Sequence, residues 1–289
     1  MLLLYLLPFS LLLSYFFIDK NNRRVHISIL QIVSILILYN APKTLLRDLD
    51  VYIIDIGELT GHDINETIVL LLMIVSWSLF LRLLRIYNYS IASIYGFYVL
   101  AFPTLACNQL RLLFALLIFL IFSNRKSIFQ FVYPVLIHKS MLIVVFIKTL
   151  KLKKYFLVFL VLFILFFINT NFEDIFIEIL PYLGNLSTYI NASEISNIYV
   201  SRNFFEGIEF PLFFIFISWN NYKKYELIGL VLIYIYFKNL DIPSVILLRL
   251  YELGCYLIFL LRYKRIKLNF IEFSLISCLL LLRFIYHYQ

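Results

Sequence analysis

Apolar runs separated by short polar stretches recur along the chain, and they constrain its fold more than any other feature of the sequence. The clearest runs cover residues 27–41, 67–81, 91–106, 110–122 and 270–285. Lipid offers the backbone no hydrogen-bond partner, so a chain crosses a bilayer as helices or as a closed barrel. Because these runs are continuous rather than alternating, they exclude barrel strands. We therefore predict an all-α fold, a polytopic bundle of transmembrane helices.

Composition agrees with a membrane protein. The chain is 63% hydrophobic and 15% charged, a balance that a soluble domain cannot sustain. The net charge of +8 comes from Lys and Arg that lie mostly in the short loops, as in membrane proteins, so no nucleic-acid partner is expected. No pair among the 3 cysteines has the spacing of a metal site, and we predict neither a metal nor a cofactor.

The basic loops predict how the chain is threaded. Residues 20–24, 82–85 and 125–126 carry cations and are separated by pairs of apolar runs, which places all three on the cytoplasmic side. The first run, residues 1–18, is then a retained span with its N-terminus outside. A single crossing by residues 127–148 would put a lysine cluster outside. We predict instead a hairpin of two half-helices that turns near His138.

The rest of the chain continues this alternation. It gives roughly eleven or twelve membrane segments. We predict one integral membrane domain, residues 1–289, with a long outer loop at about 169–207.

Two arginines are predicted near outer helix ends. Arg111 lies at the start of the run 110–122, which runs inward, so a guanidinium and the helix N-terminus together can bind a phosphate. Arg249 repeats the arrangement in the run 244–261. The structural alternatives are that Arg111 snorkels to the interface and that Arg249 pairs with Glu252.

Candidate bases fall on the same side. His138 at the hairpin tip can accept a proton near neutral pH, although a lone histidine in an apolar run is often a packing residue. Asp48 and Asp50 form an Asp-x-Asp pattern in an acidic outer loop, which is either solvated or able to position a sugar hydroxyl. The long outer loop combines acids, Arg202 and aromatic residues, a composition that suits sugars.

These residues resemble a known family. Residues 108–111 (Asn-Gln-Leu-Arg), then 125–126, then 136–140 (Leu-Ile-His-Lys-Ser) are similar to the hallmark of the EpsG/Wzy-like polysaccharide polymerases. That hallmark is a Gln-x-Arg span entry followed by a His-x-Ser step. Residues 48–52 resemble the acidic-plus-Tyr loop of the family, and 248–251 resemble its late Arg-plus-aromatic span.

The resemblance implies a GT-C-like membrane glycosyltransferase of the bacterial inner membrane, multi-pass, with its active site facing the periplasm. Its expected reaction transfers a glycan chain from undecaprenyl diphosphate to the terminal hydroxyl of another lipid-linked repeat unit, as O-antigen or capsule polymerases do. Expected partners are that lipid-linked oligosaccharide, membrane lipid and a chain-length regulator. The implied site residues are His138, Asp48 and Asp50 for catalysis, Arg111, Arg249 and Arg202 for the diphosphate, and Tyr52, Gln109, Glu206 and Tyr251 for the glycan.

Three other functions remain open at this point. An O-antigen ligase would share the outer site and the lipid diphosphate. A transporter or flippase of lipid-linked oligosaccharide would favour inverted repeats with Gly/Pro-broken helices, and the sequence has no repeat and only 7 Gly. An outer-face acyltransferase would carry an early His or an Arg-x-x-x-Arg pattern, and neither is convincing here.

Overall fold

The computed structural model describes residues 10–11, 13–40, 53, 57, 61, 65–107, 109–122, 129–137, 141, 209–218 and 244–288. The chain divides into two compact units, one formed by Met1–Phe146 with Tyr256–Gln289 and the other by Ile147–Cys255. Every regular element within these described ranges is helical, which confirms the all-α part of the predicted fold.

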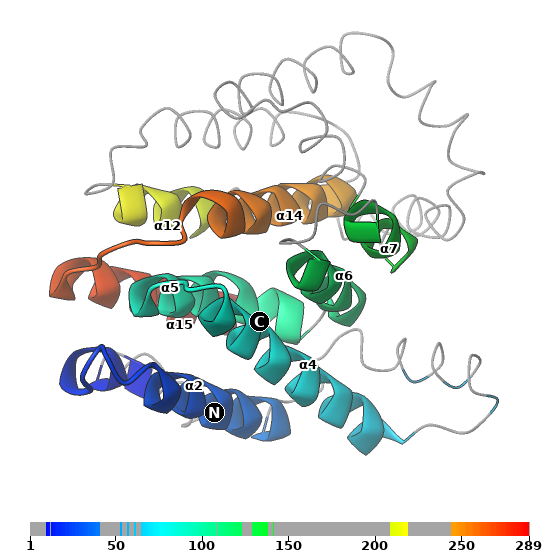
Figure 1. Ribbon diagram of the computed structural model, residues 1–289, viewed down its shortest axis with the longest axis horizontal. Helices are drawn as coiled ribbons and strands as arrows, with labels where there is room; N and C mark the ends of the chain where they lie inside the picture. Colours follow the sequence, from blue (N-terminus) through cyan, green and yellow to red (C-terminus); the bar gives the residue numbers. More distant parts are fainter. Residues whose placement is uncertain are drawn as a thin grey trace, which may run out of the picture. The chain divides into compact units, whose positions relative to one another are not determined.

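The described helices follow the apolar runs of the sequence (Figure 1). The run 110–122 is one helix, and the helices that begin at Ile91, Ser244 and Phe270 start where the sequence predicts. The elements are α2 (Arg23–Asn40), α4 (Glu66–Ile86), α5 (Ile91–Ala101), η1 (Phe102–Ala106), α6 (Leu110–Phe122), α7 (Phe129–Ile137), α12 (Glu209–Ser218), α14 (Ser244–Arg262) and α15 (Phe270–Tyr288).

Helix α4 has clear local signals at both ends. The side chain of Asn65 caps it by accepting a hydrogen bond from the Thr67 N–H at 3.2 Å. The helix continues past Arg82 and Arg85, the two cations that follow the apolar run in the sequence, because cations are favourable near a helix C-terminus. Asn88, with φ of 58°, then takes the left-handed conformation that Asn tolerates, and the chain turns.

Helix α4 is also the one described helix that is long and apolar enough to cross a bilayer. Its 21 residues span about 30 Å at the helical rise. Its buried face carries large apolar residues such as Trp77 and Phe80. Its exposed face is apolar as well, at Ile68, Leu71, Val75, Leu79 and Ile86. Further described helices are apolar but shorter.

Helix α5 forms the centre of the first unit, and each of its residues is buried. Phe97 stacks on Phe80 of α4 with ring centroids 5.2 Å apart and tilts against Phe259 near the end of α14 at 5.5 Å. Gly96 faces the same ring, since a Cβ there would lie 3.4 Å from the Phe259 ring, in van der Waals contact with it. Tyr95 packs edge-on against Phe273 of α15.

The run predicted at 91–106 is not a uniform helix. It continues from α5 into the π-helical turn η1, whose second residue is Pro103. Proline has no N–H and its ring clashes with the preceding turn, so the regular ladder is interrupted there. The Thr104 hydroxyl in this turn is hydrogen-bonded to the Tyr256 hydroxyl.

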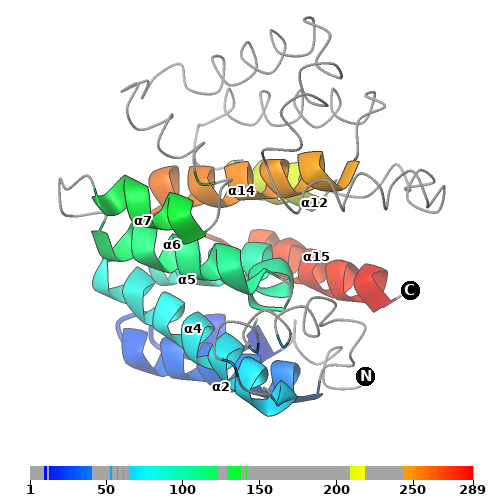
Figure 2. The ribbon, with the colours of Figure 1, turned by 90° about the vertical axis from the view of Figure 1, so that its right-hand side faces the viewer.

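Helices α2 and α4 lie side by side and antiparallel, and both views of the molecule show this pairing (Figures 1 and 2). The Gln31 side chain donates to the Ser78 carbonyl at 3.2 Å, which fixes their register. Arg23 at the start of α2 is therefore level with the end of α4. Asn40, at the other end of α2, is level with the first turns of α4.

Candidate functional site

One end of the first unit gathers the basic loops. The Ser90 N–H donates to the Lys264 carbonyl at 2.9 Å, and the Ser90 hydroxyl donates to the Ile266 carbonyl at 3.1 Å. The Tyr15 hydroxyl donates to the Leu268 carbonyl at 3.3 Å, which brings the segment before α2 to the same place. We call this the basic end, and its cations are Lys20, Arg23, Arg24, Arg82, Arg85, Lys264, Arg265 and Lys267.

The end of α6 reaches the basic end too. The Tyr87 hydroxyl, directly after α4, donates to the Ile121 carbonyl at 3.2 Å. In the sequence, Arg125 and Lys126 follow the last residue of α6 within four positions. Helices α4 and α6 thus end at the basic end, and α2 and α5 begin there, which is the alternation that the charges predict. Which side of a membrane this end faces stays a prediction.

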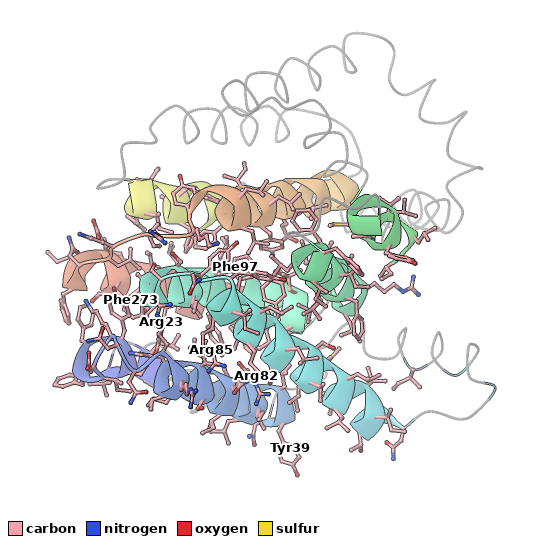
Figure 3. The ribbon with its side chains drawn as sticks, in the orientation of Figure 1. Arg23, Tyr39, Arg82, Arg85, Phe97 and Phe273 are labelled. Atoms are coloured by element: carbon pink, nitrogen blue, oxygen red, sulfur yellow. The ribbon has the colours of Figure 1, made fainter. Side chains whose placement is uncertain are left out.

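The opposite end of α2 and α4 carries the acidic segment. Because the register of the two helices is fixed, residues 41–64 are joined to the unit at the end away from Arg23. Arg23 and Tyr39 mark the two ends of α2 in Figure 3, with Arg85 nearer than Arg82 to the Arg23 end. The predicted site residues Asp48, Asp50 and Tyr52 belong to this segment and themselves lie outside the described residues.

Arg111 is the second residue of α6 and is exposed, and Gln109 directly precedes the helix and is partly buried. The structure therefore brings these two predicted residues together at one helix N-terminus. Along α6, Arg111 lies about 17 Å from Phe122, which is at the basic end. The neighbouring helix α4 is about 30 Å long. The depth of Arg111 in a membrane stays a prediction.

A guanidinium at this depth limits what its surroundings can be. If the helices cross a bilayer, an arginine below the rim is costly against hydrocarbon and faces the interior or a wet cavity. The helix N-terminus adds the positive end of the helix dipole. Such an arrangement attracts anions, and a phosphate is the anion that arginine contacts best.

Helix α7 bears on the predicted hairpin. It packs beside α6, with the Tyr133 and Phe122 rings 6.0 Å apart, and it ends at Ile137, directly before His138. Its 9 described residues span about 13 Å at the helical rise. The predicted hairpin of two half-helices stays a prediction. His138 itself lies outside the described residues.

The remaining predicted site residues are not joined to Arg111 by the structure. Arg249 and Tyr251 lie on α14 in the second unit, and their side chains are not among those described. Arg202 and Glu206 also lie outside the described residues. A shared pocket of Arg111, Arg249 and His138 therefore stays a prediction.

A buried polar cluster that was not predicted lies near the basic end. His26 is fully buried, and its Nδ1 lies 3.1 Å from the Tyr95 hydroxyl, which is also hydrogen-bonded to the Ser14 hydroxyl at 2.7 Å. No described group partners the His26 Nε2 atom. A histidine at the first turn of an apolar run was the available signal. The cluster lies away from Arg111, so we assign it to packing between α2, α5 and the segment before α2.

The described residues contain no group of three His, Cys, Asp or Glu side chains that could hold a metal ion. Comparisons of the chain with known protein families, curated proteins and solved structures found no match. A functional assignment therefore depends on the chain's own residues and their placement.

Proposed function

We propose that the chain is a multi-pass glycosyltransferase of the bacterial inner membrane that polymerises a surface polysaccharide. It would transfer a growing glycan from undecaprenyl diphosphate to the terminal hydroxyl of another lipid-linked repeat unit. The observation that carries the proposal is the position of Arg111, an exposed cation at the N-terminus of α6, remote along that helix from the basic end.

The apolar exposed faces of α2 and α4 support the membrane setting. On α4 they include Leu71, Val75 and Leu79, and on the neighbouring α2 they include Ile32 and Leu36. A soluble protein would place polar residues on the open faces of two adjacent helices. Contiguous apolar surface of this kind marks contact with lipid or with a partner. Lipid is the simpler occupant, because α4 also has the length of a bilayer span.

The charge distribution supports the orientation. Basic loops stay in the cytoplasm, so the basic end faces inward. The N-terminus of α6 and the acidic segment 41–64 then face the periplasm, where lipid-linked repeat units become available after they are flipped. The proposed site opens sideways to the membrane, because both substrates keep their lipid tails.

The proposed chemistry follows from a diphosphate leaving group and a hydroxyl acceptor. Arg111 and the positive end of the α6 dipole stabilise the negative charge that develops on the diphosphate, with Arg249 and Arg202 as further cations. Gln109 is placed to contact the glycan beside the reacting bond, and Tyr52, Glu206 and Tyr251 are the other proposed glycan contacts.

The acceptor needs a base, and we assign that role to His138, with Asp48 or Asp50 as the alternative. The acceptor oxygen attacks the anomeric carbon while the bond from that carbon to the diphosphate oxygen breaks. The acceptor proton passes to the base, and undecaprenyl diphosphate leaves. The step needs no oxidant, reductant or cofactor.

Arginine substitution tests this proposal directly. In cells that lack the native gene, Arg111→Ala is expected to abolish long polysaccharide ladders on gels, because removing one charge-stabilising donor lowers such rates about 10²–10³-fold. Arg111→Lys keeps the charge but loses the planar fork, so we expect shortened ladders. Arg82→Ala, an exposed cation on α4 toward the other end, is the matched control and should leave the ladders intact.

Two outcomes would count against the proposal. Full-length ladders from Arg111→Ala, at normal protein level, would overturn it. Loss of all surface glycan, rather than retention of single repeat units, would instead indicate a ligase.

A further inference from the structure

We propose that the basic end is a binding surface for anionic phospholipid headgroups, and that the ammonium groups of Lys20 and Lys264 are its two fixed contacts. This inference does not depend on the enzymatic activity proposed above. It rests on the packing of the two lysines, the charge balance of the surface and the apolar side chains that border it.

Lys20 is held against the buried core. Its Nζ atom lies 5.1 Å from the centroid of the Tyr15 ring. Tyr15 is itself fixed, since its ring stacks on Phe273 at 4.4 Å and its hydroxyl donates to the Leu268 carbonyl. A cation over an aromatic face is attracted to the ring and keeps its N–H donors for other partners.

Lys264 repeats this arrangement on the neighbouring loop. Its Nζ atom lies 5.6 Å from the centroid of the Tyr89 ring. Tyr89 is buried, and its hydroxyl donates to the Leu260 carbonyl at 2.6 Å. Both lysines are exposed residues whose ammonium groups rest on rings anchored in the helix bundle. Two positive charges are thereby held at the surface, directly over rings of the apolar core.

The surface around these lysines is strongly positive. The described residues of the basic end include eight cations, all exposed except the partly exposed Arg85. The described carboxylates at this end are Asp19, which accepts a hydrogen bond from Asn21, and Glu272. Glu272 is buried and caps α15 by accepting from the Asn269 N–H at 2.9 Å. The imbalance favours an anionic partner.

Exposed apolar side chains near these cations favour a bilayer surface over a water-soluble polyanion as the anionic partner. Phe17 precedes Lys20 and is 82% exposed, and Ile271 follows the 264–267 loop and is 69% exposed. Ile86, next to Arg85, ends the apolar stripe of α4. A water-soluble polyanion would leave these side chains in water. A bilayer covers them with acyl chains and brings its phosphates to the level of the cations.

The test uses the full-length chain purified in detergent, with thermal unfolding as the readout. Adding phosphatidylglycerol is expected to raise the Tm of the wild type more than the same amount of phosphatidylcholine. The double variant Lys20→Gln with Lys264→Gln should lose that difference, because the two fixed charges are gone. The charge-preserving pair Lys20→Arg with Lys264→Arg is the matched control and should retain it.

Three results would overturn the proposal. They are equal stabilisation of the wild type by both lipids, an undiminished phosphatidylglycerol effect in the Gln pair, and stabilisation by inorganic polyphosphate as large as that by phosphatidylglycerol. The last would identify the surface as a site for soluble polyanions. If the Gln pair does not fold, native mass spectrometry of the wild type decides, since preferential retention of phosphatidylglycerol supports the proposal and retention of both lipids alike overturns it.

Discussion

Helices α4 and α5 are both apolar and pack against each other, but they use their apolar residues differently. Helix α5 buries every residue and gives its tyrosine hydroxyls polar partners, such as the bond between Tyr98 and Ser34. Helix α4 buries one face, and its other face exposes a stripe of apolar residues from Ile68 to Ile86 that only the exposed Arg82 interrupts among the described positions. Hydropathy alone does not separate a bundle-core helix from one that faces lipid. The distinction appears in which positions the neighbouring helices cover.

The largest effect is expected from truncation in the α5 core. Phe97→Ala removes a fully buried ring between Phe80 and Phe259 and should destabilise the protein by about 3–5 kcal/mol. Leu79→Ala on the exposed stripe of α4 is the matched control, and we expect a change of about 0.5 kcal/mol or less. Chemical unfolding in detergent measures both. Equal losses would mean that the stripe of α4 is packed against protein rather than open to lipid.

A charge placed in the α4 stripe should have the next largest effect. Val75 is exposed near the middle of α4, and an arginine at the centre of a span costs about 2.5–3.5 kcal/mol of insertion free energy. Val75→Arg should therefore lower the inserted fraction of the helix in a translocon insertion assay. Ile86→Arg, at the basic end, is the control and should insert normally. Normal insertion of Val75→Arg would contradict a lipid-facing stripe.

The comparison also shows what the sequence could predict about the helices. The limits of α6 were predicted correctly, because an unbroken apolar run between polar stretches determines a helix through local interactions alone. The end of α4 was misjudged by five residues, since Arg82 and Arg85 mark a change of polarity and not the end of the backbone ladder. The π-helical turn at Phe102 was missed, although Pro103 was a visible signal for it.

Long-range contacts lay beyond sequence reasoning. The hydrogen bond between His26 and Tyr95 joins residues 69 positions apart, and no local pattern in one sequence encodes such a pairing. For the same reason the candidate site is only partly placed. Gln109 and Arg111 are neighbours in sequence, so their proximity was predictable from the chain itself. The assembly of Arg111 with Arg249 and His138 requires tertiary packing across distant segments, and it stays a prediction.

The smallest effect is expected from removing a tyrosine hydroxyl that is hydrogen-bonded in the α5 core. Tyr98→Phe keeps the fully buried ring, which stacks on Phe102, but removes the hydroxyl bonded to Ser34 at 3.1 Å. We expect a loss of about 1 kcal/mol, because Ser34 still donates to the Leu30 carbonyl and is not left without a partner. Tyr39→Phe, on an exposed residue of α2, should leave the unfolding free energy unchanged. If both variants unfold alike, the hydroxyl bonds of α5 contribute no stability, and its burial is maintained by packing alone.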